Sequence, residues 1–290
     1  MKKLLSLFFL TSITLSACGT AFTQPTPTVK PSTPTRTATQ TSTATSTPIP
    51  PTATITLTPT ITPTLDPVRS TPPTIMLHRP NVNFDSLQFL KDLVVILKQE
   101  NMHVITYREI YEDSAITATQ KGHLFIITID DIYLPYPIDP RVLEMIAVLR
   151  EAGFPAVLSI VTQGDYAYPD TVRTLQELSD EGWEIATHTN NHDNLGIMES
   201  KAPRAVGPEI SISMDKIEFV LGVRPITLVL PEGQMVNNAE PLKEAGVVWA
   251  VGINGGLNYN DQRALHYVGR ESPAKTAEQT FKNMKARFGF

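Results

Sequence analysis

Short apolar runs alternate with amphipathic segments through most of the chain, and this alternation predicts a repeated strand–helix order. Runs of four to eight apolar residues are typical of buried parallel strands, and apolar positions three or four apart are typical of helices. The pattern predicts strands over residues 74–77, 103–106, 124–130, 155–161, 183–187, 226–230, 247–251 and 267–268. It predicts helices over residues 86–101, 108–113, 140–153, 170–181, 208–221, 239–245 and 276–287. This order favours an α/β fold, in which helices cover a parallel sheet.

Polar residues gather directly after the predicted strands. In barrels of alternating strands and helices, the active site is built from the loops at the carboxyl ends of the strands. The regular placement of these residues therefore favours a (β/α) barrel over an open sheet and puts them on one rim. They are His78, the pair 130–131, His188, and the segments 231–233 and 254–256.

The start of the chain has the features of a targeting segment. Lys2 and Lys3 precede an apolar stretch over residues 4–15, which is too short for a permanent membrane span. The segment ends at Cys18, the chain's single cysteine, and resembles the bacterial lipoprotein signal. We predict a signal peptide over residues 1–17 and a lipid on Cys18, with an ordinary secretory signal and a stray cysteine as the alternative. A single cysteine also excludes an intramolecular disulfide.

Residues 18–73 are composed largely of Thr, Pro, Ser and Ala. Such a segment lacks the apolar surface that offsets the entropy of ordering, so we predict a disordered linker. Residues 74–290 are expected to form one domain, because their length suits a single hydrophobic core.

The charge of the chain bears on its partners. The formal net charge is −5, and no basic stripe with interleaved aromatic residues is present. Nucleic acid is therefore excluded as the expected partner. The lipid on Cys18 is the expected membrane contact, and the sequence gives no indication of the oligomeric state.

Two carboxylates and two histidines form the most informative polar set. Asp130 and Asp131 follow the apolar run 124–129, and His188 and His192 are four positions apart after the run 183–187. On a helical turn that spacing places both imidazoles on one face, where they can share an ion. Each pair alone is a weak signal, but together at the ends of neighbouring strands they predict a metal site.

The same residues carry a family resemblance. Residues 128–131 read Thr-Ile-Asp-Asp, residues 188–192 read His-Thr-Asn-Asn-His, and residues 230–233 read Leu-Pro-Glu-Gly. In this order and spacing they resemble motifs of the polysaccharide deacetylases (the nodulation-type deacetylase domain, carbohydrate esterase family four). The resemblance extends over about residues 74–270.

The resemblance implies a deformed (β/α) barrel that hydrolyses N- or O-acetyl groups on sugars. It assigns Asp131, His188 and His192 as ligands of a divalent metal, most simply Zn²⁺, with Co²⁺ or Ni²⁺ as alternatives. It assigns Asp130 as the base that takes a proton from the attacking metal-bound water. This agrees with general chemistry, because two imidazoles and one carboxylate leave coordination positions open for water and substrate.

The general acid is less well defined by sequence. Residues 75–78 read Ile-Met-Leu-His, which is similar to the Met-Tyr-His segment of a circularly permuted subgroup, the poly-N-acetylglucosamine deacetylases. This similarity implies His78 as the acid, whereas His266 is the competing candidate. A strand-end His78 without a catalytic role is a third interpretation.

The third motif departs from the family pattern. Leu228 or Val229 stands where an arginine that orients the base is expected, and Arg270 is a possible replacement. By the resemblance, Pro231, Gly233 and Arg270 form the expected substrate-binding set.

Three functions follow from these observations. The leading hypothesis is a metal-dependent deacetylase, exported and lipid-anchored to the outer face of the cell envelope membrane, acting on an acetylated polysaccharide. The alternative is a catalytically impaired glycan-binding or scaffold lipoprotein that keeps the metal site, which the missing arginine motivates. The third is an esterase or amidase for a different acyl substrate.

Overall fold

The structure is a computed structural model, which describes residues 72–113, 116, 123–253, 259–260 and 265–289. The predicted signal peptide over 1–17 lies outside these residues, as does the predicted linker over 18–73 apart from its last two positions. In the described part of the chain, no helix combines the length and apolar character that crossing a membrane requires.

Strands and helices alternate along the described chain, as the apolar pattern predicts. The strands are β1 (Thr74–Leu77), β2 (His103–Val104), β3 (Leu124–Tyr133), β4 (Val157–Val161), β5 (Glu184–Thr187), β6 (Thr227–Val229), β7 (Trp249–Ile253), β8 (Tyr259–Asn260) and β9 (His266–Arg270). The helices are α1 (Ser86–Gln99), α2 (Tyr107–Glu112), α4 (Pro140–Ala152), α5 (Pro169–Asp180), α6 (Leu195–Lys201), α7 (Val206–Leu221), α8 (Glu240–Ala245) and α9 (Ala277–Phe288), with 3₁₀ turns η1 (Pro203–Ala205) and η2 (Pro231–Gly233).

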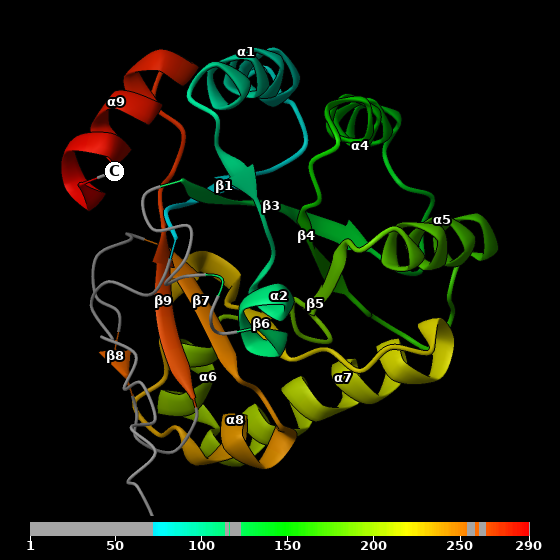
Figure 1. Cartoon of the computed structure of the whole chain (residues 1–290). Helices are drawn as coiled ribbons and strands as arrows, with labels where there is room; N and C mark the ends of the chain where they lie inside the picture. The colour runs from blue at the N-terminus through cyan, green and yellow to red at the C-terminus, as the bar shows by residue number, and fades with distance from the viewer. Residues whose placement is uncertain (1–71, 114–115, 117–122, 254–258, 261–264, 290) are drawn as a thin grey trace, which may run out of the picture. The chain divides into compact units, whose positions relative to one another are not determined.

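The parallel strands form a nearly closed barrel. The sheet order is β1-β3-β4-β5-β6-β7-β9, with β8 added antiparallel to β9 and β2 paired to the start of β3. The ring closes where Ile75 of β1 bridges Glu271, directly after β9. The longer helices α1, α4, α5, α7 and α9 lie around the outside of the strands (Figure 1). The predicted (β/α) barrel is thus confirmed, and the carboxyl ends of its parallel strands share one rim.

Local sequence signals account for several helix boundaries. The Asp85 side chain accepts a hydrogen bond from the backbone N–H of Gln88 and caps α1. Pro140 occupies the first turn of α4, where a missing N–H has no cost, and Gly153 ends that helix in a left-handed conformation. Asp85, Pro140 and Gly153 thus account for the predicted helix start at residue 86 and for the predicted limits of the helix over 140–153.

The structure differs from the sequence-based elements at two places near the rim. Strand β3 does not stop at Asp130 but continues to Tyr133, because it resumes pairing with β4 after an irregularity. Helix α6 follows the histidine loop, and the apolar pattern did not predict it because this short helix buries a single side chain, Leu195.

Helix α2 closes the amino end of the barrel. Tyr107 and Ile110 pack into the same apolar cluster as barrel residues such as Val157 and Val229. The Tyr107 hydroxyl hydrogen bonds Thr74 at the start of β1 (3.1 Å). The cluster fills the barrel interior from this end, so access for a ligand is left to the opposite rim.

A buried carboxyl group joins α2 to the barrel. Glu184 at the start of β5 is 1% exposed, and it accepts hydrogen bonds from the backbone N–H of Arg108 and the hydroxyl of Thr227. Burial raises the pKa of Glu184 to about 6, although these hydrogen bonds act in the opposite direction. The folded state therefore holds this proton more tightly than the unfolded chain, in which a glutamate titrates near ~4.3.

We expect Glu184 to make the free energy of unfolding fall as pH rises from about 4 to about 7, by roughly 2 kcal/mol. The folded chain binds more protons in this window, so deprotonation favours the unfolded state. Urea unfolding of wild type and Glu184→Gln across this range measures the difference between their stabilities. Glu144→Gln, at an exposed position of α4, is the control. A wild-type-minus-variant difference that does not change with pH would contradict this assignment.

Candidate active site

A bulge in β3 presents two adjacent carboxylates at the rim. Ile129 pairs with Leu158 and Ile132 pairs with Ile160, so two residues of β3 lie opposite the single residue Ser159. In a regular strand, neighbouring side chains point to opposite faces. Here Asp131 adopts a left-handed conformation with φ of 64°. The extra residue re-aims one side chain, as bulges do, and gives Asp130 and Asp131 different surroundings on the same rim.

Asp131 lies against two imidazoles. Its Oδ1 atom is 3.4 Å from Nε2 of His188 and 3.1 Å from Nε2 of His192. The two rings are 4.7 Å apart between centroids and nearly perpendicular. One ligand atom from each of these three residues falls within 4.8 Å of the others, a grouping that a metal ion can bridge.

The contacts of His188 indicate which of its nitrogens faces the site. Nδ1 is 2.7 Å from the carbonyl oxygen of Val229, at the end of β6. A carbonyl only accepts, so Nδ1 carries the proton and Nε2 faces Asp131. Such a bond to the far nitrogen orients a metal-binding histidine and fixes its tautomer.

The residues present fit a divalent cation. Asp131 Oδ1 is buried and accepts no hydrogen bond, although two imidazole nitrogens point at it. Either a proton on each Nε2 or a cation between the three atoms satisfies this arrangement, and the convergence on one point favours the cation. Two imidazoles and one carboxylate are a frequent ligand set of catalytic zinc sites.

The histidine loop is not helical, which corrects the expectation from the four-residue spacing. Residues 188–194 have no helical assignment, and α6 begins only at Leu195. Thr189 and His192 have φ values of 65° and 63°. These two left-handed residues turn the chain back, so the imidazoles meet through a loop rather than along a helix face.

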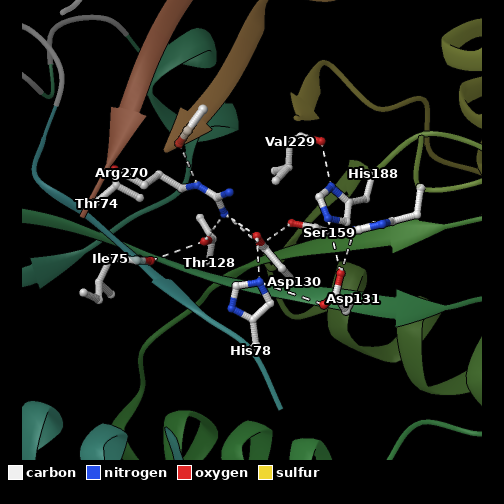
Figure 2. A network of polar contacts seen from close by, with 12 residues as sticks. Thr74, Ile75, His78, Thr128, Asp130, Asp131, Ser159, His188, Val229 and Arg270 are labelled. Atoms are coloured by element: carbon white, nitrogen blue, oxygen red, sulfur yellow. Dashed lines mark hydrogen bonds and ion pairs between the residues drawn. The ribbon is translucent and has the colours of Figure 1, made fainter. Parts of the chain in front are cut away.

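Asp130 occupies a buried site below the rim, and Arg270 holds it there (Figure 2). Asp130 is 2% exposed and Arg270 is 1% exposed. One terminal guanidinium nitrogen donates to both carboxylate oxygens at 2.8 and 2.7 Å, while Nε donates to the carbonyl of Gly252 at 3.2 Å. Arg270 therefore contacts Asp130 as expected of a substitute for the missing third-motif arginine. Because Arg270 is buried, the carboxylate of Asp130, and not bulk solvent, compensates its charge.

Two hydroxyl groups, whose roles the sequence motifs did not predict, complete the surroundings of Asp130. Ser159 donates to Asp130 Oδ1 at 2.9 Å. Thr128 accepts from Arg270 at 2.7 Å and donates to the carbonyl of Ile75 at 3.3 Å. A signal was available for Ser159, because it is the one hydroxyl in the otherwise apolar run Val157–Val161.

The neighbours of both carboxyl groups control their protonation. Burial acts to raise the pKa of Asp130, but the charge of Arg270, the nearby imidazoles and the hydrogen bond from Arg270 together outweigh burial and lower the pKa below its usual range. Burial likewise acts to raise the pKa of Asp131, yet the adjacent imidazoles of His188 and His192 hold that pKa well below its usual range. In return, the carboxylate of Asp131 raises the pKa of His192. Both acids are thus ionised at neutral pH.

His78 lies at the end of β1, across from the two carboxylates. Its Nε2 is 4.0 Å from Asp130 Oδ2 and 3.9 Å from Asp131 Oδ2, and its side chain is 41% exposed. His266, the competing acid, begins β9, whereas Arg270 ends the same strand. Four residues of a strand span about 13 Å, so His266 belongs to the opposite end of the barrel. The geometry therefore favours His78 as the acid.

The segment after β6 forms the wall beside His188. Pro231 is buried and begins the turn η2. Gly233 has φ of 68°, and a Cβ atom there would lie 2.3 Å from Ile253. The lack of a side chain at Gly233 thus allows the turn η2 to pack closely against the end of β7. Substrate contact by Pro231, Gly233 and Arg270 stays a prediction.

Comparison with protein families gives one match to this part of the chain. The family model for polysaccharide deacetylase matches residues 117–249, which include Asp130, Asp131, His188 and His192. His78 and Arg270 lie outside the matched range. Comparison with the curated proteins finds no significant match.

Solved structures share the fold at low sequence identity. A deacetylase from Streptococcus pyogenes, PplD in complex with acetate, has 17% identity and a TM-score of 0.59, covering 73% of this chain and 97% of its own. A de-N-acetylase from Aggregatibacter actinomycetemcomitans has 18% identity and a TM-score of 0.58, with 73% and 98% covered. IcaB from Ammonifex degensii has 16% identity and a TM-score of 0.57, with 75% and 97% covered. These likenesses establish the fold.

We expect Arg270→Met to lower the free energy of unfolding at pH 7 by about 3–5 kcal/mol, because it leaves the buried charge of Asp130 without its cation. Urea unfolding of the metal-free protein measures this loss. The added change Asp130→Asn removes the orphaned charge and should recover part of it. Arg287→Met is the control, since Arg287 forms an exposed pair with Glu271, worth about 0–1 kcal/mol. A loss as small as that of the control would show that Arg270 does not compensate Asp130.

Proposed function

The chain belongs to the polysaccharide deacetylase family, and we propose that it is a metal-dependent hydrolase that removes acetyl groups from a polysaccharide. The observation that carries the proposal is the division of the two adjacent carboxylates. Asp131 lies with two imidazoles, and Asp130 lies with a guanidinium group. One carboxylate is thus arranged to bind an ion, while its neighbour is kept ionised and free to take a proton.

In this proposal Asp131, His188 and His192 hold a divalent ion, most simply Zn²⁺, with Co²⁺ or Ni²⁺ as alternatives. When bound, the ion makes water more acidic and polarises the acetyl carbonyl, and a ligand set of charge −1 leaves the site net positive toward a developing oxyanion. The Val229 carbonyl supports the metal-facing orientation of His188.

Asp130 is the proposed general base. Its Oδ2 atom accepts from Arg270 and faces the open site beside His78, whereas Oδ1 is occupied by both Arg270 and Ser159. Oδ2 is therefore the oxygen placed to take a proton from the attacking water. Arg270 keeps the carboxylate ionised and oriented toward the site. After Asp130 takes the proton, its hydrogen bonds to Arg270 and Ser159 keep the side chain in place.

His78 is the proposed general acid. Hydrolysis breaks the bond between the acetyl carbon and the sugar nitrogen, and the departing nitrogen needs a proton. His78 faces both carboxylates from the far side of the site, and its partly exposed ring can exchange protons with solvent. Acetate and a free amine are the products. With an O-acetyl substrate the same groups release acetate and an alcohol, so the geometry supports both N- and O-deacetylation.

The exposed tyrosines at the rim support a sugar substrate. Tyr136 is 56% exposed and Tyr166 is 57% exposed, and they lie in the segments that follow β3 and β4. The Tyr133 and Tyr136 rings are 6.2 Å apart. A tyrosine offers an apolar ring face and a polar hydroxyl group. It therefore suits a sugar, which has an apolar ring face and hydroxyl groups at its edges.

We expect the purified protein to release acetate from N-acetylglucosamine oligomers, and Asp130→Asn to slow that release by about 10²- to 10⁴-fold, because the base is lost. Asp180→Asn, at an exposed position on α5, is the matched control. A chelator should abolish turnover of the wild type, and added Zn²⁺ or Co²⁺ should restore it.

Two outcomes separate the alternatives. Wild-type turnover by Asp130→Asn would remove Asp130 as the base. A wild-type protein that binds metal but turns over no acetylated glycan, whether N- or O-acetylated, would favour a glycan-binding or scaffold role instead.

For its location, we propose that the protein is exported and lipid-anchored at the outer face of the cell envelope membrane. The support comes from sequence: two lysines precede an apolar stretch that ends at Cys18, and a Thr/Pro-rich segment follows. A linker of this kind would let the barrel reach polysaccharide at some distance from the membrane.

We expect Cys18→Ala to move the protein from the membrane fraction to the soluble fraction, because the cysteine is the proposed acceptor of the lipid. Fractionation of cells that express wild type or the variant, with acetate release as a check on folding, measures the change. Continued membrane association of the variant would rule out the lipid anchor.

A further inference from the structure

The loop that carries both histidines contains unfavourable backbone conformations. Thr189 and His192 have φ values of 65° and 63°. Side chains other than glycine rarely adopt this left-handed region, and a β-branched residue such as Thr189 is especially disfavoured. Such conformations persist when the surrounding structure holds them. The loop therefore requires restraint from outside itself.

Glu209 of α7 supplies contacts to the residues between the two histidines. Its Oε1 atom accepts from the backbone N–H of Asn191 at 2.5 Å, and its Oε2 atom accepts from the Asn191 side chain at 2.9 Å. Its backbone carbonyl accepts from the N–H of Asn190 at 3.1 Å. These bonds fix both residues that separate the left-handed Thr189 from the left-handed His192.

The position of Glu209 suits a carboxylate and not a neutral side chain. Glu209 is 6% exposed and lies in the first turn of α7, where the helix dipole favours a negative charge. Both of its oxygens face N–H donors. A glutamine of the same shape would turn an NH₂ group toward one of these donors, so one of the two bonds would be lost.

Other residues on the same face of α7 also contact the rim. Ser213, four positions after Glu209, accepts a hydrogen bond from Thr187 at 2.8 Å, just before His188. Lys216, three positions further, donates to the carbonyl of Thr162 at 2.8 Å and to that of Tyr166 at 3.3 Å. Residues at this spacing lie on one helix face. This face of α7 thus supports two neighbouring rim loops.

We propose that Glu209 is a positioning residue for the metal site: it holds the loop in the conformation that brings the imidazole of His192 to Asp131. The inference rests on the proposed metal function. Glu209 touches neither substrate nor the three ligand atoms, and it acts through Asn190 and Asn191. Without it, the left-handed residues relax, and the two imidazoles no longer converge before the ion binds.

The test measures metal affinity of the whole purified protein by competition with a chromophoric Zn²⁺ chelator. Loss of a residue that orients a ligand costs about 10- to 100-fold in metal affinity, and we expect a loss in this range for Glu209→Gln. Glu218→Gln is the matched control, since Glu218 is an exposed glutamate of the same helix and pairs with Arg224. The visible spectrum of the Co²⁺ form should change in Glu209→Gln and not in the control.

A second variant keeps the inference testable if Glu209→Gln unfolds. Asn191→Ala removes one donor at an exposed side chain and should weaken Zn²⁺ binding several-fold. If the two residues act together, the double variant loses no more affinity than Glu209→Gln alone.

The outcomes separate this inference from the proposed function. Tight Zn²⁺ binding by the wild type together with unchanged affinity and an unchanged Co²⁺ spectrum in Glu209→Gln and Asn191→Ala would overturn the role of Glu209 alone. A wild-type protein that binds no divalent metal would overturn the proposed function and this inference with it.

Discussion

The bulge at Asp130 and Asp131 is the constraint on which the rest of the site depends. Two adjacent acids in a regular strand would point to opposite faces, one into the barrel interior and one toward the helices. Two residues of β3 lie opposite Ser159, and Asp131 adopts a left-handed conformation. Both carboxylates therefore lie at the same rim of the barrel. Each then meets a different partner. The carboxylates are close in sequence but are separated chemically by their hydrogen bonds.

Closure of the barrel supplies the partners of Asp130. Arg270 comes from the last parallel strand, and His78 comes from the first. They meet the carboxylates because the segment after β9 bridges Ile75 of β1. Of the residues that would bind metal, Asp131 lies on β3 and both histidines lie in the loop after β5, whereas the partners of Asp130 lie at the seam. A substitution that disturbs the seam is therefore expected to displace Asp130 before it displaces Asp131.

Rules that act over a few residues made part of the structure predictable from sequence. Asp85, Pro140 and Gly153 mark helix ends by capping and backbone preference, which need no distant partner. The alternation of elements predicted the α/β fold, and the polar residues directly after the predicted strands favoured the barrel. The bulge was not predictable, because pairing with β4 creates it and the run itself contains no sign of it.

The candidate site shows the same division. The residues that converge were identified by type and order, but the reason for their convergence was not. The spacing of His188 and His192 indicated a helical turn, whereas two left-handed residues and contacts from α7 produce the arrangement. Arg270 was predicted as a possible partner of Asp130, and closure of the ring places it there. Glu209 could have been noticed as a charged residue on the buried face of an amphipathic helix.

We propose that two neighbouring carboxylates have separate roles, one on a metal ion and one on a guanidinium group. The most direct measurement is a crystal structure of the Zn²⁺-loaded protein with anomalous diffraction recorded at the zinc edge. We predict a single rim ion bound by Asp131 and by Nε2 of His188 and His192, with Asp130 still held by Arg270 and not bound to the ion. A zinc ion bound by Asp130, or no zinc at these residues, would contradict the account.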